Sequence, residues 1–215
     1  MDRDQFALGV VEVAKRFRQE NPHHADHLTS QYLSAVHVAG IFDMYRVSIE
    51  YLKSKGARDV LDIGSGVGFA GVIDKTIALT NLDTTDADLF EYCFDHFELK
   101  KAFKLFAFKA VRDRMWVDTE STFDGIIMYR FLPFHGMYGK AFNDDDFVRL
   151  LTEADRLLND GGRLLYWGVD QEILNQIKSK YTITWDTFPN SPVAILTKRK
   201  LRDIIDVITT ANKVL

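Results

Sequence analysis

The sequence contains a single cysteine, Cys93, among its 215 residues. One cysteine excludes an internal disulfide and a multi-cysteine zinc site, and such usage is typical of a reducing compartment. The first residues, MDRDQFALGVVEVAKRF, are charged throughout and lack the apolar segment of a signal peptide. No apolar run in the sequence is long enough to cross a bilayer. We therefore expect a cytoplasmic protein without a membrane partner.

Neither sign of charge dominates, since the sequence has 27 basic and 31 acidic residues and a net charge of −4. A chain of this charge has no overall field that attracts nucleic acid, so such a partner would need a local patch. The segment LKKAFKLFAFKAVRDR interleaves basic and aromatic residues, but half of it reads as a buried strand. We therefore do not expect nucleic acid to bind.

Metal-binding patterns are equally sparse. His23 and His27 lie four residues apart, which would suit a metal on a helix. No cluster of acids or cysteines lies nearby to complete a site, and Asn21-Pro22 favours a turn there. We expect a solvated loop and no metal.

Helical and strand patterns alternate along most of the chain. Two helical regions fill residues 1–55, and DVLDIG then follows as a short apolar strand of the kind found at the centre of a parallel sheet. Further helices and strands alternate up to GGRLLYWGV, which predicts βαβ crossovers and a doubly wound, mostly parallel α/β sheet. The expected single domain of residues 1–215 has a helical cap (1–55), a core (56–198) and a C-terminal helix (199–215).

The end of the chain departs from this alternation. The strand patterns YTITWDTF and PVAILTK are separated only by PNS, which is too short for a crossover helix. They should therefore pair as an antiparallel hairpin. The helix expected after them carries apolar residues on one face, which would dock on the sheet or, as a second possibility, form a homodimer contact.

The segment RDVLDIGSGVGFAGV carries the strongest chemical signal. It contains four glycines in eight residues, and they fit two patterns. GxGxG suggests an adenosyl-sulfonium cofactor, whereas GxGxxG suggests a dinucleotide. An acid ending the first strand would face the pyrophosphate of a dinucleotide unfavourably, which favours the first pattern.

Residues 35–198 as a whole resemble a class I S-adenosylmethionine-dependent methyltransferase. VLDIGSGVG is similar to the first motif of that family, in which an acid lies two residues before GxGxG. Here the acid and the glycines are Asp62, Gly64, Gly66 and Gly68. The resemblance implies a seven-stranded sheet ending in the hairpin described above, with S-adenosylmethionine as the cofactor.

The second motif of the family resembles ALTNLDTTDADLFEYC and places Asp83 at the end of strand two. A carboxylate there can accept hydrogen bonds from both ribose hydroxyls. The resemblance also places Ser65, Thr84 and Met128 beside the cofactor. The adenine would be met by Asp113, which could instead form a surface salt bridge with a neighbouring arginine.

The methyl acceptor would face the segment MYRFLPFHGMYGKAF after strand four. Tyr129 is a candidate for acceptor contact, Arg130 for holding an anionic group, and His135 for a general base. The alternatives are a pocket lid or core for the aromatic residues, a partner acid for Arg130, and an ordinary loop position for His135. The Asn/Asp-Pro-Pro-aromatic motif of many amino-group methyltransferases is missing, so a small-molecule acceptor is favoured.

Two other functions fit the same sequence. The chain could be a non-catalytic module that keeps the methyltransferase fold to bind a partner, since no acceptor motif is recognisable. It could also be an NAD(P)-dependent oxidoreductase, since dinucleotide enzymes share the glycine loop and the ribose carboxylate.

Overall fold

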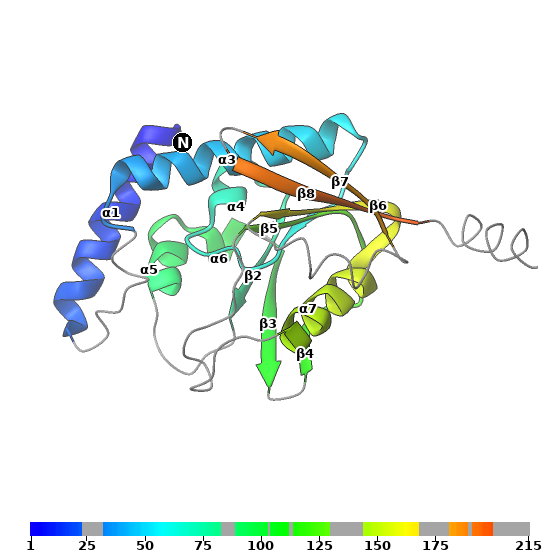
Figure 1. Ribbon diagram of the computed structural model, residues 1–215. Helices are drawn as coiled ribbons and strands as arrows, with labels where there is room; N and C mark the ends of the chain where they lie inside the picture. The colour runs from blue at the N-terminus through cyan, green and yellow to red at the C-terminus, as the bar shows by residue number, and fades with distance from the viewer. Residues whose placement is uncertain are drawn as a thin grey trace, which may run out of the picture.

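The computed structural model describes residues 1–22, 32–82, 89–102, 104–111, 114–129, 144–167, 181–188 and 191–199 (Figure 1). Their centre is one sheet with the strand order β4-β3-β2-β1-β5-β6-β8-β7. The strands are β1 Val60–Asp62, β2 Ala78–Leu82, β3 Leu105–Val111, β4 Arg114–Val117, β5 Phe123–Tyr129, β6 Leu158–Trp167, β7 Tyr181–Phe188 and β8 Ser191–Lys198.

The five inner strands from β3 to β6 run parallel to one another, as the apolar strand patterns predicted. Strand β8 pairs antiparallel with both β6 and β7, so the expected C-terminal hairpin is confirmed. Within the described residues the sheet has eight strands rather than the expected seven, because Arg114–Val117 folds back antiparallel on β3 at the edge.

The described helices are α1 Arg3–Glu20, α3 Ala35–Ser54, α4 Phe69–Ile73, α5 Leu89–His96, α6 Leu99–Ala102 and α7 Asp144–Leu157. Helix α7 lies on one side of the sheet, while α1, α3, α4 and α5 lie on the other (Figure 1). Strand β5 shows how alternation builds both layers: Ile126 belongs to the core on the α7 side, and Ile127 to the core beneath the N-terminal helices. None of the described helices is both long and apolar enough to cross a membrane.

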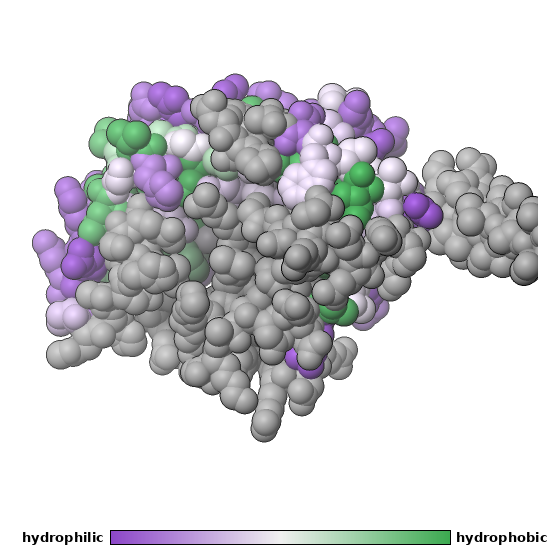
Figure 2. All heavy atoms as spheres, viewed as in Figure 1, coloured by the Kyte–Doolittle hydropathy of each residue, from purple (hydrophilic) through white to green (hydrophobic). Residues whose placement is uncertain are grey.

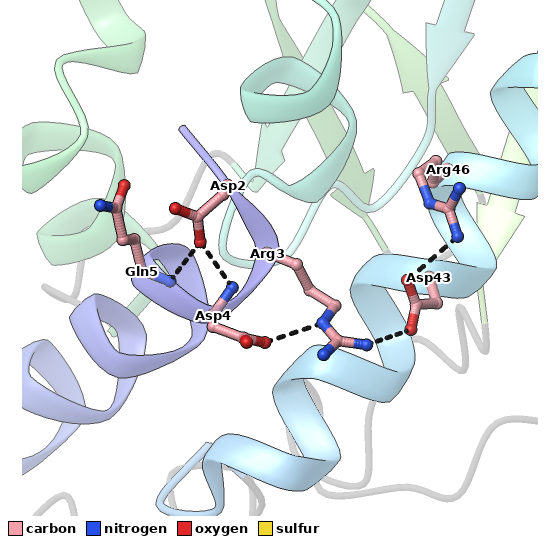
Figure 3. Close-up of polar contacts among 6 residues, drawn as sticks. All are labelled: Asp2, Arg3, Asp4, Gln5, Asp43 and Arg46. Carbon is pink, nitrogen blue, oxygen red and sulfur yellow. Dashed lines mark hydrogen bonds and ion pairs between the residues drawn. The ribbon is translucent and has the colours of Figure 1, made fainter.

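The N-terminal cap begins with a well-formed helix start. The Asp2 carboxylate accepts hydrogen bonds from the backbone N–H groups of Asp4 (3.0 Å) and Gln5 (2.9 Å), which caps α1 (Figure 3). Arg3 then joins α1 to α3 by pairing with Asp43 at 3.0 Å. The outer sides of these helices carry mainly hydrophilic residues, as expected for amphipathic helices facing solvent (Figure 2).

Helix α3 begins at Ala35, where the Ser34 hydroxyl accepts the His37 N–H, and it forms the described part of the second helical region expected before residue 55. The helix expected in residues 199–215 falls outside the described residues, apart from residue 199. Strands β1, β2 and β5 all end at the same edge of the sheet because they are parallel. Strand β1 lies where the chain changes from building one half of the sheet to the other, the position where open α/β sheets bind ligands.

Candidate functional site

The turn between β1 and α4 is the centre of the candidate site. Gly64, Gly66 and Gly68 all have positive φ, at 76°, 52° and 90°, so the turn requires residues without a Cβ. Gly64 and Gly66 keep part of their surface exposed, whereas Gly68 is buried. The exposed backbone of the first two glycines is therefore the part of the turn that a ligand can approach.

Each later glycine has a packing reason as well. A Cβ on Gly68 would lie 2.1 Å from Cδ1 of Leu99, and a Cβ on Gly71 would lie 2.8 Å from Cδ1 of Leu79. These two glycines let α6 and β2 approach α4 closely. The GxGxG and GxGxxG patterns are thus both explained by local packing, and the glycines alone do not separate the two cofactor classes.

Two buried hydroxyls hold the turn against β2. The Ser65 hydroxyl donates to the carbonyl oxygen of Asp62 at 2.9 Å and accepts the Thr80 N–H at 2.9 Å. The Thr80 hydroxyl donates to the same carbonyl at 3.1 Å and accepts the Gly64 N–H at 2.8 Å. Ser65 was predicted to contact the cofactor, and here its fully buried hydroxyl shapes the loop. The role of Thr80 was not predicted, and its only signal in the sequence is a hydroxyl inside an apolar strand.

The carboxylate of Asp62 is completely buried at the end of β1. Its Oδ1 accepts a hydrogen bond from the Tyr45 hydroxyl at 3.2 Å. Its Oδ2 has no hydrogen-bond partner within the described part of the chain. Burial is the main cause that raises the pKa of Asp62 to about 7, and hydrogen bonding by Ser65 and Tyr45 offsets part of that rise. A buried carboxylate oxygen without a partner among the described residues can accept a hydrogen bond from a donor or meet a cation.

Aromatic rings pack around Tyr45, the hydrogen-bond partner of Asp62. The Tyr45 ring stacks on Phe69 of α4 with 5.3 Å between centroids and 11° between planes. The ring centroid of Tyr129, at the end of β5, lies 5.7 Å from that of Tyr45 and 6.1 Å from that of Trp167. The Trp167 indole N–H donates to the Ser48 hydroxyl at 3.0 Å. A ring contact and a hydrogen bond thus connect the ends of β5 and β6 to the middle of α3.

Tyr32 covers the glycine turn from the segment before α3. Its hydroxyl would lie 3.5 Å from a Cβ placed on Gly66, and its ring meets Phe90 edge-on at 6.0 Å. The Tyr32 side chain is almost entirely buried, and that burial raises the pKa of its phenol well above the ordinary value. Tyr32 is thus a buried packing residue that also lies next to the glycine turn.

The remaining predicted residues divide into two groups. Tyr129 lies on the same face of β5 as Ile127, toward α3, whereas Met128 points into the core on the α7 side and is fully buried. Only the Met128 backbone is therefore in a position to meet a cofactor. The other candidates lie outside the described residues: Asp83, Thr84, Asp113, Arg130 and His135.

Within the described ranges, no three His, Cys, Asp or Glu side chains are grouped so that they could hold a metal ion. His23 and His27 lie outside those ranges. The described site therefore offers a carboxylate and backbone groups rather than a metal-ligand set. A carboxylate with one free oxygen next to an exposed glycine backbone fits a ligand that carries a cationic group beside polar ones.

No family model matches the sequence, and no curated protein matches it. Solved structures do match. The chain is similar to a methyltransferase from Pyrococcus furiosus, with a TM-score of 0.50 and 21% identity, over 73% of this chain and 83% of that one. It is also similar to the O-methyltransferase from Bacillus cereus in complex with SAH, with a TM-score of 0.51 and 11% identity, over 87% and 91% of the two chains. Together with the strand order and the terminal hairpin, these similarities show that the chain has the class I methyltransferase fold.

Proposed function

We propose that this protein transfers a methyl group from S-adenosylmethionine to a small-molecule acceptor. The observation that carries the proposal is the buried Asp62 carboxylate, whose Oδ2 has no partner among the described residues. An ionised carboxylate in such a place is costly unless a cation meets it. The ammonium and sulfonium groups of S-adenosylmethionine are cations of the required kind.

The same carboxylate argues against a dinucleotide. A pyrophosphate bound at the glycine turn would bring negative charge toward Asp62, and buried like charges repel strongly. The site would then need a compensating cation, and the described residues around Asp62 supply hydroxyls and aromatic rings instead. This balance favours the adenosyl-sulfonium cofactor over NAD or NADP.

The bound cofactor supplies an electrophilic methyl group, so the protein contributes mainly alignment and exclusion of water. In the proposed complex, Asp62 holds the cationic end of the ligand, and the backbone of Gly64 and Gly66 allows close approach. Asp83, which directly follows β2, accepts hydrogen bonds from the ribose hydroxyls, and Thr84 lies beside it in the chain. Asp113, in the connection between β3 and β4, is the candidate for the adenine end.

The acceptor would enter beside the end of β5. Tyr129 lies there among aromatic rings, on the face of the sheet against which Tyr45 of α3 packs. The two residues proposed for acceptor chemistry follow it in the chain: Arg130 to hold an anionic group, and His135 to remove a proton. An aromatic surround and one basic residue suit a small, partly apolar anionic molecule.

Calorimetry with S-adenosylhomocysteine tests the proposal on three proteins. The wild type should bind with a dissociation constant on the order of micromolar. Asp83→Ala should weaken binding by at least about tenfold, because the ribose hydroxyls lose their acceptor. Asp59→Ala is the matched control: this exposed acid precedes β1 at the opposite edge of the sheet, and its variant should bind like the wild type.

Other outcomes identify the alternatives. Absence of heat with both S-adenosylmethionine and S-adenosylhomocysteine would favour a non-catalytic module. Thermal stabilisation by NAD or NADP, without stabilisation by S-adenosylhomocysteine, would favour an oxidoreductase. If binding is found, fractionated lysate with a labelled methyl donor would then identify the acceptor class.

A further inference from the structure

The bond between Tyr45 and Asp62 divides the two carboxylate oxygens into different roles. Tyr45, in the middle of α3, donates its hydroxyl to Oδ1 at 3.2 Å, while Oδ2 has no partner in the described structure. The Tyr45 ring is itself held, because it stacks on Phe69 and contacts Tyr129. The donor is therefore fixed by packing that does not depend on its hydroxyl.

We infer that Tyr45 is a positioning residue of the proposed cofactor site, which orients Asp62 by binding Oδ1 so that Oδ2 is kept for the ammonium group of the ligand. This inference rests on the proposed function. It adds a role for α3, whose side chain reaches the carboxylate from outside the glycine motif. The helix would thereby help to set the affinity of a site that the β1–α4 turn forms.

The chemistry of the pair supports this division of roles. Burial raises the pKa of the Tyr45 phenol well above its ordinary value, so Tyr45 remains a hydrogen-bond donor whenever the protein is folded near neutral pH. Two other titratable groups interact electrostatically with Tyr45: the phenol of Tyr32, before α3, and that of Tyr129, on β5. The Cys93 thiol of α5 is coupled to Tyr32 in turn. None of these groups is cationic, so the ligand would bring the positive charge.

A proton and the ligand then compete for the same carboxylate. Burial raises the pKa of Asp62 to about 7, and hydrogen bonding by Ser65 and then by Tyr45 lowers it from a still higher value. Removing the hydroxyl should raise the pKa of Asp62 further, so the carboxylate would be protonated over a wider pH range. Relative to wild type, the variant without the Tyr45 hydroxyl should therefore bind the ligand more weakly at acidic pH and almost equally well at basic pH.

Calorimetry with S-adenosylhomocysteine should therefore be carried out from about pH 6 to pH 8.5 on wild type and Tyr45→Phe. The ammonium of the ligand titrates identically in both experiments. The ratio of the two affinities therefore reports only how titration of the protein differs between wild type and variant. We expect Tyr45→Phe to bind about tenfold more weakly than wild type near pH 6 and within about twofold of it near pH 8.5.

Three further measurements complete the test. Tyr51→Phe removes a hydroxyl from the same helix and should leave the ratio near one at every pH. Asp62→Asn should bind weakly, with no pH dependence beyond that of the ligand. In the ligand-free proteins, carboxyl NMR should place the pKa of Asp62 higher in Tyr45→Phe than in wild type.

The outcomes separate the two proposals. Binding by wild type together with a pH-independent ratio, whether near one or uniformly low, would overturn the positioning role and leave the cofactor site standing. An unchanged Asp62 pKa in Tyr45→Phe would overturn it as well. If the wild type binds neither S-adenosylmethionine nor its product at any pH, the proposed function fails, and the inference fails with it.

Discussion

Replacing Asp62 with asparagine should change how the stability of the protein depends on pH. Asparagine keeps an oxygen that can accept the Tyr45 hydroxyl and has the same shape, but it carries no charge at any pH. In the wild type, burial raises the pKa of Asp62 from 3.8 to about 7. One pKa unit corresponds to about 1.4 kcal/mol, so the ionised, ligand-free carboxylate costs about 4 kcal/mol of folding free energy.

The direction of the effect follows from the raised pKa. The folded protein holds the Asp62 proton more tightly than the unfolded chain does. Between about pH 4 and about pH 7 the contribution of Asp62 to stability therefore falls as pH rises, and above that range the loss is complete. Asparagine has no such dependence, although its buried NH₂ group costs about 1–3 kcal/mol if it stays unpaired.

Urea unfolding of wild type and Asp62→Asn at a series of pH values measures this contribution. The free energy of unfolding of the variant, minus that of the wild type, should rise by about 3 kcal/mol between about pH 5 and about pH 8. Other titrating groups cancel in the difference. A difference that stays constant over this range would show that the carboxylate is solvated in the folded protein, and it would refute the argument that Asp62 awaits a cation.

Two further changes test the packing around the site by urea unfolding. Gly68→Ala should lower the free energy of unfolding by about 2–4 kcal/mol, because its Cβ would overlap Leu99 and its φ is 90°. The control Gly56→Ala, with a φ of 87° and nothing within 4 Å of the added Cβ, should lower it by only about 1 kcal/mol. Equal losses in the two variants would contradict the packing argument. Trp167→Phe should lower the free energy of unfolding by about 1 kcal/mol through the lost bond to Ser48, and by a further amount because the smaller ring leaves part of the core unfilled. Ser48→Ala should then cost less in that background than in wild type, and an undiminished cost would show that the bond contributes nothing.

Much of the fold was predictable from local patterns. The parallel strands were recognisable as short apolar runs between helical segments, and the hairpin of β7 and β8 followed from the short link between them. Strand β4 was not predicted, because its four residues carry no alternation that distinguishes an edge strand from a loop. Its pairing depends on β3 lying beside it in the folded sheet.

The candidate site was predictable in part. The sequence located the acid and the glycines, because a sharp turn after a buried strand requires residues without a Cβ. It also assigned Ser65 and Met128 to the cofactor, which stays a prediction; the structure adds that the Ser65 hydroxyl holds the loop and that the Met128 side chain lies in the core. The roles of Asp83, Arg130 and His135 stay predictions.

The sequence by itself determined most of the strands and helices along the chain, the turn after β1 and the acid beside it, since these features depend on neighbouring residues alone. Only the tertiary structure decided that Asp62 is fully buried, that Tyr45 binds one of its oxygens, and that the other oxygen is left without a described partner. The physical reason is that Tyr45 and Asp62 lie on different elements, 17 positions apart. Packing of α3 against the end of the sheet brings them together, and that packing is a property of the whole core.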